Sequence, residues 1–183
     1  MFYELIVTLF IFGPLFYLRV VKNQSWDSIR KELLGKYKGH WKEAKGALML
    51  CGLLLLGFVA VMIAITAVEA ASGASINDLG NVQQVVKEEF ASGIWVYLGT
   101  MAVVVFAEEF LFRAFLVPRI GIFPSTIIFS AFHFGYGSVA EIIGVFALGL
   151  ILAWWYRKNR SIYQNYAGHM LYNLIAVALY AFF

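Results

Sequence analysis

Residues 93–118 read GIWVYLGTMAVVVFAEEFLFRAFLVP, an apolar run that carries Glu108, Glu109 and Arg113 in its second half. A hydrocarbon core about 30 Å thick needs roughly 20 apolar residues per helix, so this run is long enough to cross a bilayer. Ionisable side chains inside such a helix are costly unless they face a protein interior or a water-filled cavity. We therefore interpret the three charged residues as the mark of a functional site in a membrane protein.

The composition of the whole chain agrees with a lipid environment. Of the 183 residues, 62% are hydrophobic and 14% are charged, whereas soluble domains are far more polar. Six apolar runs lie at about 2–18, 47–68, 94–117, 123–134, 139–156 and 162–183. We predict an all-α, polytopic membrane bundle of about six transmembrane segments, the fourth too short to span alone. Because no linker composition interrupts the chain, we expect a single membrane-embedded domain over residues 1–183.

Lysine and arginine are unevenly distributed between the loops. The loop between the first two runs contains Arg19, Lys22, Arg30, Lys31, Lys36, Lys38, Lys42 and Lys45. The next loop is mostly acidic, and basic residues return at 157–160. Since basic loops favour the cytoplasm, we predict a multi-pass protein of the plasma (inner) membrane with its site nearer the cytoplasmic face. This topology accounts for the formal charge of +3, so no nucleic-acid partner is indicated.

Further polar residues lie in the later apolar runs. His133 is in the fourth run, and His169 and Asn173 are in the sixth. Counted at 1.5 Å per residue from the cytoplasmic end of each helix, Glu108, His133 and His169 all lie about 12–14 Å into the membrane. His169 and Asn173 share one helix face, and Phe129 lies one turn from His133. We therefore expect these side chains to converge on one site from three helices.

Helical spacing separates the roles of the two adjacent glutamates. Glu109 and Arg113 are four residues apart, so they share a face and can form an ion pair. Glu108 is rotated by about 100° from Glu109 and is left for another role. We interpret the Glu109–Arg113 pair as a supporting structural element. Glu141, near the start of the fifth run, is interpreted as a cap of that helix.

The residue types at the predicted site indicate hydrolysis. A carboxylate beside an imidazole can deprotonate water, while an amide and a second imidazole can stabilise the oxyanion formed on a peptide carbonyl. Ser130 lies in an ordinary apolar helix without a nucleophile elbow, and Cys51 is isolated in an apolar run, so both are interpreted as packing residues. A Glu/His/His set also resembles the ligands of catalytic zinc, although the His-Glu-x-x-His motif is absent.

Three motifs occur in order on separate apolar runs. Residues 108–113 read EEFLFR (E-E-x-x-x-R), residues 129–133 read FSAFH (F-x-x-x-H), and residues 169–173 read HMLYN (H-x-x-x-N). In these motifs the chain resembles the CPBP family of intramembrane proteases. That family includes type II CAAX prenyl endopeptidases and bacteriocin-processing or Abi-like immunity proteins. The resemblance covers roughly residues 106–177 and implies a protease motif core at about 94–183.

The resemblance implies a role for each motif residue. Glu108 and His133 would activate the attacking water, and His169 with Asn173 would form the oxyanion site. The supporting residues would be Glu109, Arg113 and Phe129. No cofactor is firmly implied; if a metal such as Zn²⁺ binds, its ligands would be Glu108, His133 and His169. The implied partner is a membrane-tethered peptide substrate, of the prenylated CAAX type or of the bacteriocin or leader type.

Two other classes of function also place polar residues inside a membrane. A small proton-coupled transporter uses carboxylates and histidines at mid-depth, but here they are concentrated in the second half of the chain, and two related halves are not evident. A non-enzymatic immunity or scaffold protein on the same fold would keep the motifs without turnover. An intramembrane endopeptidase is therefore the main prediction.

Overall fold

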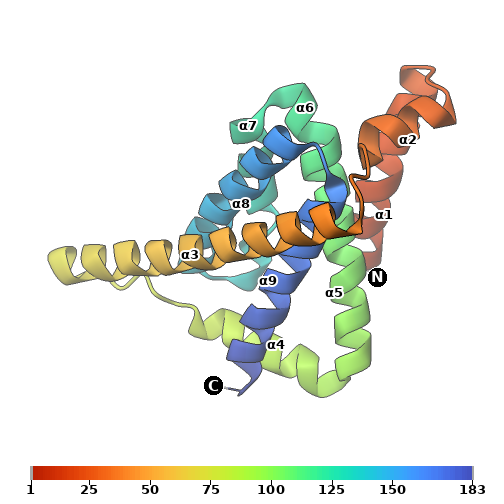
Figure 1. Ribbon diagram of the computed structural model, residues 1–183. Coiled ribbons are helices and arrows are strands. Elements are labelled where there is room, and N and C mark those ends of the chain that lie inside the picture. Colours follow the sequence, from red (N-terminus) through yellow and green to blue (C-terminus); the bar gives the residue numbers. More distant parts are fainter. Residues whose placement is uncertain (1, 183) are drawn as a thin grey trace.

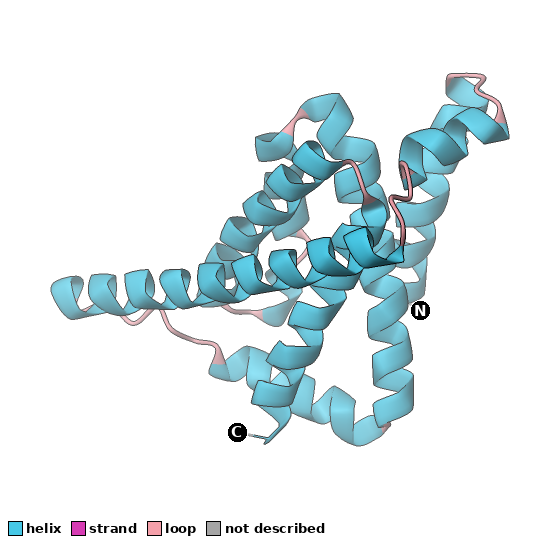
Figure 2. Ribbon diagram, viewed as in Figure 1, coloured by secondary structure: helices cyan, strands magenta, loops and turns pink. Residues whose placement is uncertain are grey.

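The chain is helical along almost its whole length (Figure 1, Figure 2). This computed structural model describes residues 2–182, and within that range it contains no strand. The α-helices are α1 (Phe2–Phe16), α2 (Trp26–Leu34), α3 (His40–Ser72), α4 (Gly80–Ser92), α5 (Ile94–Glu108), α6 (Val117–Ile120), α7 (Ile122–Ala131), α8 (Val139–Asn159) and α9 (Ile162–Phe182). Wider π-helical turns form η1 (Tyr17–Val21) and η2 (Glu109–Leu116), and a tighter turn forms η3 (Phe134–Tyr136). The prediction of an all-α fold is confirmed.

Fewer helices have the length and hydropathy of a membrane span than the sequence predicted. Within the described residues, α3 and α8 are each long and apolar enough to cross a membrane. A third span results if the bent pair Gly80–Ala91 and Ile94–Ile120 counts as one. The segment Leu5–Val21 and α7 are apolar but shorter, and α9 is long but contains several polar residues. By length and composition, two or three helices of the described residues could therefore cross a membrane, whereas the sequence predicted about six segments. Helices such as α3 and α8 are those of an integral membrane protein.

The long helices α3, α8 and α9 surround the region in which the three sequence motifs meet. The helix α3 packs along α9 and also contacts α8, while α7 packs on α8 (Figure 1). The approach of α3 to α9 is close at Gly168, where an added Cβ would lie 2.9 Å from the Ala47 carbonyl oxygen and 3.0 Å from the Leu50 Cβ. Small residues permit such close helix packing in membranes. Since Gly168 precedes His169, this contact also fixes the position of His169.

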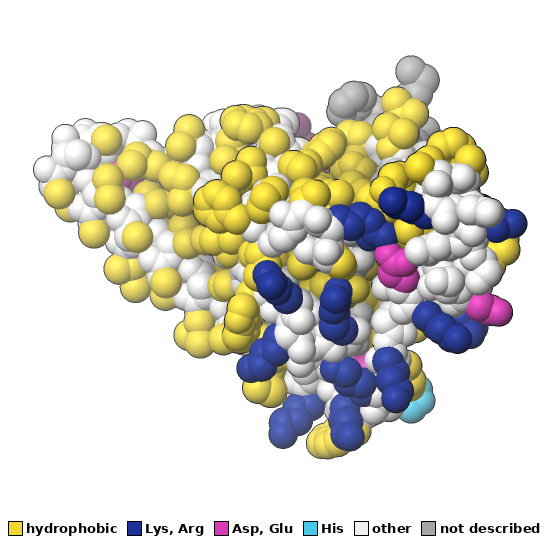
Figure 3. Space-filling view, turned by 90° about the horizontal axis from the view of Figure 1, so that it is seen from above, with side chains coloured by type: hydrophobic (Ala, Val, Ile, Leu, Met, Phe, Trp, Pro, Cys, Tyr) yellow, Lys and Arg dark blue, Asp and Glu magenta, His cyan; other side chains and the backbone are white. Residues whose placement is uncertain are grey.

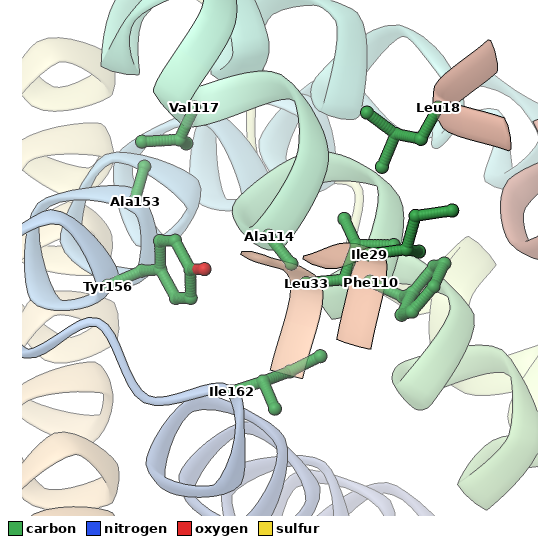
Figure 4. Close-up of a cluster of buried hydrophobic side chains, with 9 residues drawn as sticks. All are labelled: Leu18, Ile29, Leu33, Phe110, Ala114, Val117, Ala153, Tyr156 and Ile162. Carbon is green, nitrogen blue, oxygen red and sulfur yellow. The ribbon is translucent and has the colours of Figure 1, made fainter. Parts of the chain in front are cut away.

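A buried apolar cluster joins the first third of the chain to the motif-bearing half (Figure 4). Its members are Leu18, Ile29, Leu33, Phe110, Ala114, Val117, Ala153, Tyr156 and Ile162. Figure 4 shows Ile29 and Leu33 of α2 beside Phe110 of η2. The helix α2 carries no motif residue, yet its apolar face holds η2 in place.

Exposed lysine and arginine side chains gather at one end of the molecule (Figure 3). They come from η1, α2 and the start of α3, and from the end of α8. Lys38 Nζ donates a hydrogen bond of 2.5 Å to the Asn159 carbonyl oxygen, and Gly35 forms an isolated bridge with Ser161. Two basic segments that are far apart in the sequence, and that were predicted to share one side of the membrane, therefore lie side by side.

Asp78 connects the loop before α4 to the start of α8. Its carboxylate accepts hydrogen bonds from Ser138 Oγ at 2.6 Å and from the Val139 and Ala140 backbone N–H groups at 2.8 and 3.0 Å. Ser138 is also the N-cap residue of α8, because its Oγ accepts a hydrogen bond from the backbone N–H of Glu141 at 3.0 Å. The hydrogen bond from Ser138, followed by that from Val139, holds the pKa of Asp78 below its usual 3.8.

Replacement of Asp78 by alanine should lower the free energy of unfolding by about 1 kcal/mol at neutral pH, the usual cost of losing a helix cap. Because folding lowers the pKa of Asp78, its contribution is complete above the usual pKa of 3.8 and is lost as the pH falls through the lower folded-state value. When unfolding is measured in detergent from about pH 7 to pH 2, the free energies of unfolding of the two proteins should converge in acid. Asn77→Ala, at an exposed neighbour, is the control; a stability difference that persists unchanged in acid would contradict this account.

Gly168→Ala should destabilise the fold by about 1–3 kcal/mol, since the new Cβ meets the α3 backbone and one of the two helices must move. Gly52→Ala is the matched control in α3, because an added Cβ there meets nothing within 4 Å. That variant should be neutral or more stable by up to about 1 kcal/mol. The measurement is the unfolding midpoint in detergent, and equal effects of both substitutions would refute the close contact.

Candidate active site

The first motif lies where the helix that begins at Ile94 changes from α to π form. Glu108 is the last residue of α5, whereas Glu109 and Arg113 lie in the wider turns of η2. The Glu109 and Arg113 side chains are 0% and 1% exposed, and Arg113 Nη1 lies 3.2 Å from Glu109 Oε1. The ion pair predicted from the spacing is therefore present, although the helix that carries it is not regular. Wide helical turns of this kind are frequent at functional sites.

The buried Glu109 carboxylate has a second partner on α9. His169 Nδ1 lies 2.9 Å from Glu109 Oε1. An ionised carboxylate only accepts hydrogen bonds, so Nδ1 carries the hydrogen and Nε2 remains on the other edge of the ring. Glu109 thus orients His169 in the way that a triad carboxylate orients its histidine. Sequence spacing predicted the contact with Arg113 but not the contact with His169, which joins residues 60 positions apart.

Phe129 packs against the polar side chains of the site. Its ring centroid lies 4.8 Å from that of His133 and 6.5 Å from that of His169, and the Arg113 guanidinium carbon lies 4.0 Å from the Phe129 centroid. His133 Nδ1 lies 3.1 Å from the Phe129 carbonyl oxygen, so it donates there. His133 Nε2 is then 4.0 Å from Glu108 Oε1. Through its ring and its carbonyl group, Phe129 positions both histidines.

One cavity of about 440 Å³ collects the predicted site residues. It lies between α3, α4, α5, α8 and α9, and most of its wall is apolar. The motif side chains in its wall are Glu108, Phe129, His133, His169 and Asn173. Glu109 and Arg113 do not line it. The motifs therefore divide into residues that face the cavity and a buried pair behind its wall.

Other polar residues that the motifs do not specify line the same cavity, among them Glu141 of α8 and Tyr172 of α9. Glu141 lies in the first turn of α8, where the sequence interpretation placed it, but the capping hydrogen bond is accepted by the Ser138 side chain. The signal of Glu141 in the sequence was a charge inside the apolar run 139–156. The tyrosine gave no such signal, since its ring fits an apolar helix equally well.

The three-ligand set considered for zinc is not assembled at this site. Within residues 2–182, no group of three or more His, Cys, Asp or Glu side chains is arranged to hold a metal ion. Each site histidine has its Nδ1 engaged, His133 by a carbonyl oxygen and His169 by Glu109, which leaves two Nε2 atoms. A catalytic zinc ion takes three protein ligands. With the Glu108 carboxylate the two Nε2 atoms supply that number, but these donors are not arranged around one point among the described residues. Zinc binding stays a prediction, and the chemistry is derived from the side chains alone.

Residues 90–175 match a family model described as Rce1-like, type II CAAX prenyl endopeptidase Rce1-like. The matched stretch contains all three motifs and covers a little under half of the chain. It confirms the resemblance drawn from the motifs, and it supports in general terms a membrane protease that acts on a membrane-associated peptide. No curated protein and no solved structure matches the chain.

Glu109→Gln should destabilise the protein by about 3–5 kcal/mol, because it leaves the buried Arg113 guanidinium without a counter-charge. Glu108→Gln is the matched control one residue earlier. Since Glu108 faces the cavity, this second change should alter the free energy of unfolding by less than about 1 kcal/mol. Denaturant unfolding in detergent compares the two variants, and similar losses of stability would show that the glutamates do not differ in this way.

Proposed function

Because the motif-bearing stretch matches the type II CAAX prenyl endopeptidase Rce1-like family, we propose that this protein is an intramembrane endopeptidase that cleaves a membrane-tethered peptide with an activated water molecule. The observation that carries the proposal is a carboxylate, two imidazoles and an amide around one cavity. They belong to Glu108, His133, His169 and Asn173. Together they supply a proton acceptor and oxyanion donors, which are the groups that amide hydrolysis by water requires.

We assign the attacking water to the space between Glu108 and His133. The distance of 4.0 Å from Glu108 Oε1 to His133 Nε2 is too long for a direct hydrogen bond and suits a water molecule bonded to both. As the water oxygen forms its bond to the peptide carbonyl carbon, one water proton passes to the Glu108 carboxylate. His133 keeps its ring orientation because the Phe129 carbonyl oxygen holds Nδ1.

The charge that develops on the peptide carbonyl oxygen is assigned to His169 and Asn173. The Asn173 amide donates directly, and His169 donates from Nε2 when its ring carries both protons. The Glu109 carboxylate at Nδ1 stabilises that imidazolium. When the C–N bond breaks, Glu108 passes its proton to the leaving nitrogen, and the products are a carboxylic acid and an amine. No covalent enzyme intermediate forms.

The basic end of the molecule supports an assignment of topology. His169 follows Ile162 by seven residues in α9, so it lies about 10 Å along the helix from the end at which the basic segments meet. Because positively charged loops favour the cytoplasm, we place this end there, in a multi-pass protein of the plasma (inner) membrane. Cleavage would then occur nearer the cytoplasmic face, on a peptide of the prenylated CAAX type or of the bacteriocin or leader type.

The test is cleavage of a quenched, membrane-tethered peptide library by purified protein in detergent. Glu108→Gln and His169→Ala should each lower kcat/KM by about 10²–10⁴-fold, because one removes the proton acceptor and the other an oxyanion donor. Glu88→Gln, at an exposed carboxylate on α4, is the control and should retain wild-type activity. A strong chelator should leave the wild-type rate unchanged.

Three results would contradict the proposal. Equal turnover by wild type and Glu108→Gln would exclude the assigned proton acceptor. Loss of turnover with the chelator, followed by recovery with added zinc, would show that a metal ion activates the water and would contradict the metal-free mechanism. The absence of turnover across the library would favour a scaffold or immunity protein on the same fold.

A further inference from the structure

Glu141 places a carboxylate in the cavity at a distance from the proposed reacting groups. It lies in the first turn of α8, and its partly buried side chain lines the same cavity as Glu108 and His169. Among the described residues, no hydrogen bond or ion pair involves its carboxylate, and the interaction that defines the helix cap uses only its backbone N–H. Within the part of the chain that the structure describes, this carboxyl group therefore has no bonding partner of its own.

The cavity around Glu141 contains acids but no fixed cation. The carboxylates of Glu108 and Glu141 line it, and no lysine or arginine among the described residues does. Close to Glu141 the wall is formed by apolar residues of α8 such as Val145. Carboxylates in a concave wall of low dielectric focus a negative potential and favour a cationic ligand group. An ionisable residue placed in this way inside a membrane protein indicates a functional role.

The distance between Glu141 and His169 can be compared with the length of an extended peptide bound in the cavity. The helices α8 and α9 run in roughly opposite directions and are joined where Asn165 Nδ2 donates a hydrogen bond of 2.9 Å to the Leu152 carbonyl oxygen. Away from that contact, His169 lies four residues along α9 and Glu141 lies eleven residues along α8, a difference of about seven residues or roughly 10 Å. An extended peptide covers roughly 3.3–3.6 Å per residue. The separation therefore corresponds to about three residues from the scissile bond.

We propose that Glu141 is a specificity-determining residue that binds a lysine or arginine side chain of the substrate, about three residues from the cleaved bond. This inference rests on the proposed function, because the proposed function defines where the scissile bond lies. A cationic side chain entering the cavity would find an acid that lacks a counter-charge, whereas an apolar side chain of equal length would leave that charge unpaired. The cavity would thus select for charge as well as for apolar contact.

The experiment compares peptides that carry lysine with peptides that carry norleucine, an uncharged side chain of similar length, three residues to either side of the scissile bond. The wild type should prefer lysine in kcat/KM by about tenfold on one of the two sides. Glu141→Gln is nearly isosteric and removes no hydrogen bond of the fold, and it should reduce the preference to less than about twofold. Glu88→Gln, on the exposed face of α4, should keep the full preference.

A second arm measures binding without turnover. The dissociation constants of the same peptides are determined by calorimetry for Glu108→Gln and for Glu108→Gln combined with Glu141→Gln. The lysine preference should be present in the first protein and absent from the second, even if the wild type cleaves none of the peptides. In that case the proposed function fails while the inference holds. A preference that survives Glu141→Gln, or equal binding of lysine and norleucine peptides by both proteins, would overturn the inference.

Discussion

The burial of the Glu109 carboxylate is the constraint around which the motif-bearing half of the molecule is arranged. A charge removed from water needs compensation, which Arg113 supplies from the same π-helical segment and His169 from α9. These contacts hold η2 and α9 in one relative position. The apolar cluster around Phe110 and the close approach of α3 at Gly168 fix the same two elements from the outside.

Consecutive glutamates reach different environments because the chain turns by about 100° between them. Glu109 faces the interior and orients a histidine, whereas Glu108 faces the cavity and stands opposite His133. Stability and chemistry are thereby assigned to different carboxylates. Phe129 forms the boundary between them, since its ring lies against the Arg113 guanidinium on one side and lines the cavity on the other.

Much of the candidate site could be read from residue spacing, because positions three or four apart on a helix share a face whatever the rest of the fold does. The Glu109–Arg113 pair follows from this rule. The number of membrane spans does not follow from residue spacing, since the apolar runs of α1 and α7 are shorter than a bilayer requires and α9 is partly polar. The position of Glu141 in the first turn of α8 also follows from the sequence, but its place in the cavity wall does not, because that depends on the packing of α8 against other helices.

By itself, the sequence determined an all-α membrane protein and the residue types of its site, since hydropathy, helix periodicity and short motifs act over a few turns of chain. Tertiary structure alone decided that Glu109 bonds to His169, that η2 adopts π form, and that Glu141 shares a cavity with the motif residues. Each of these depends on how separate helices pack. The physical reason is that long-range contacts select among side-chain directions and backbone forms that local preferences leave nearly equal in free energy.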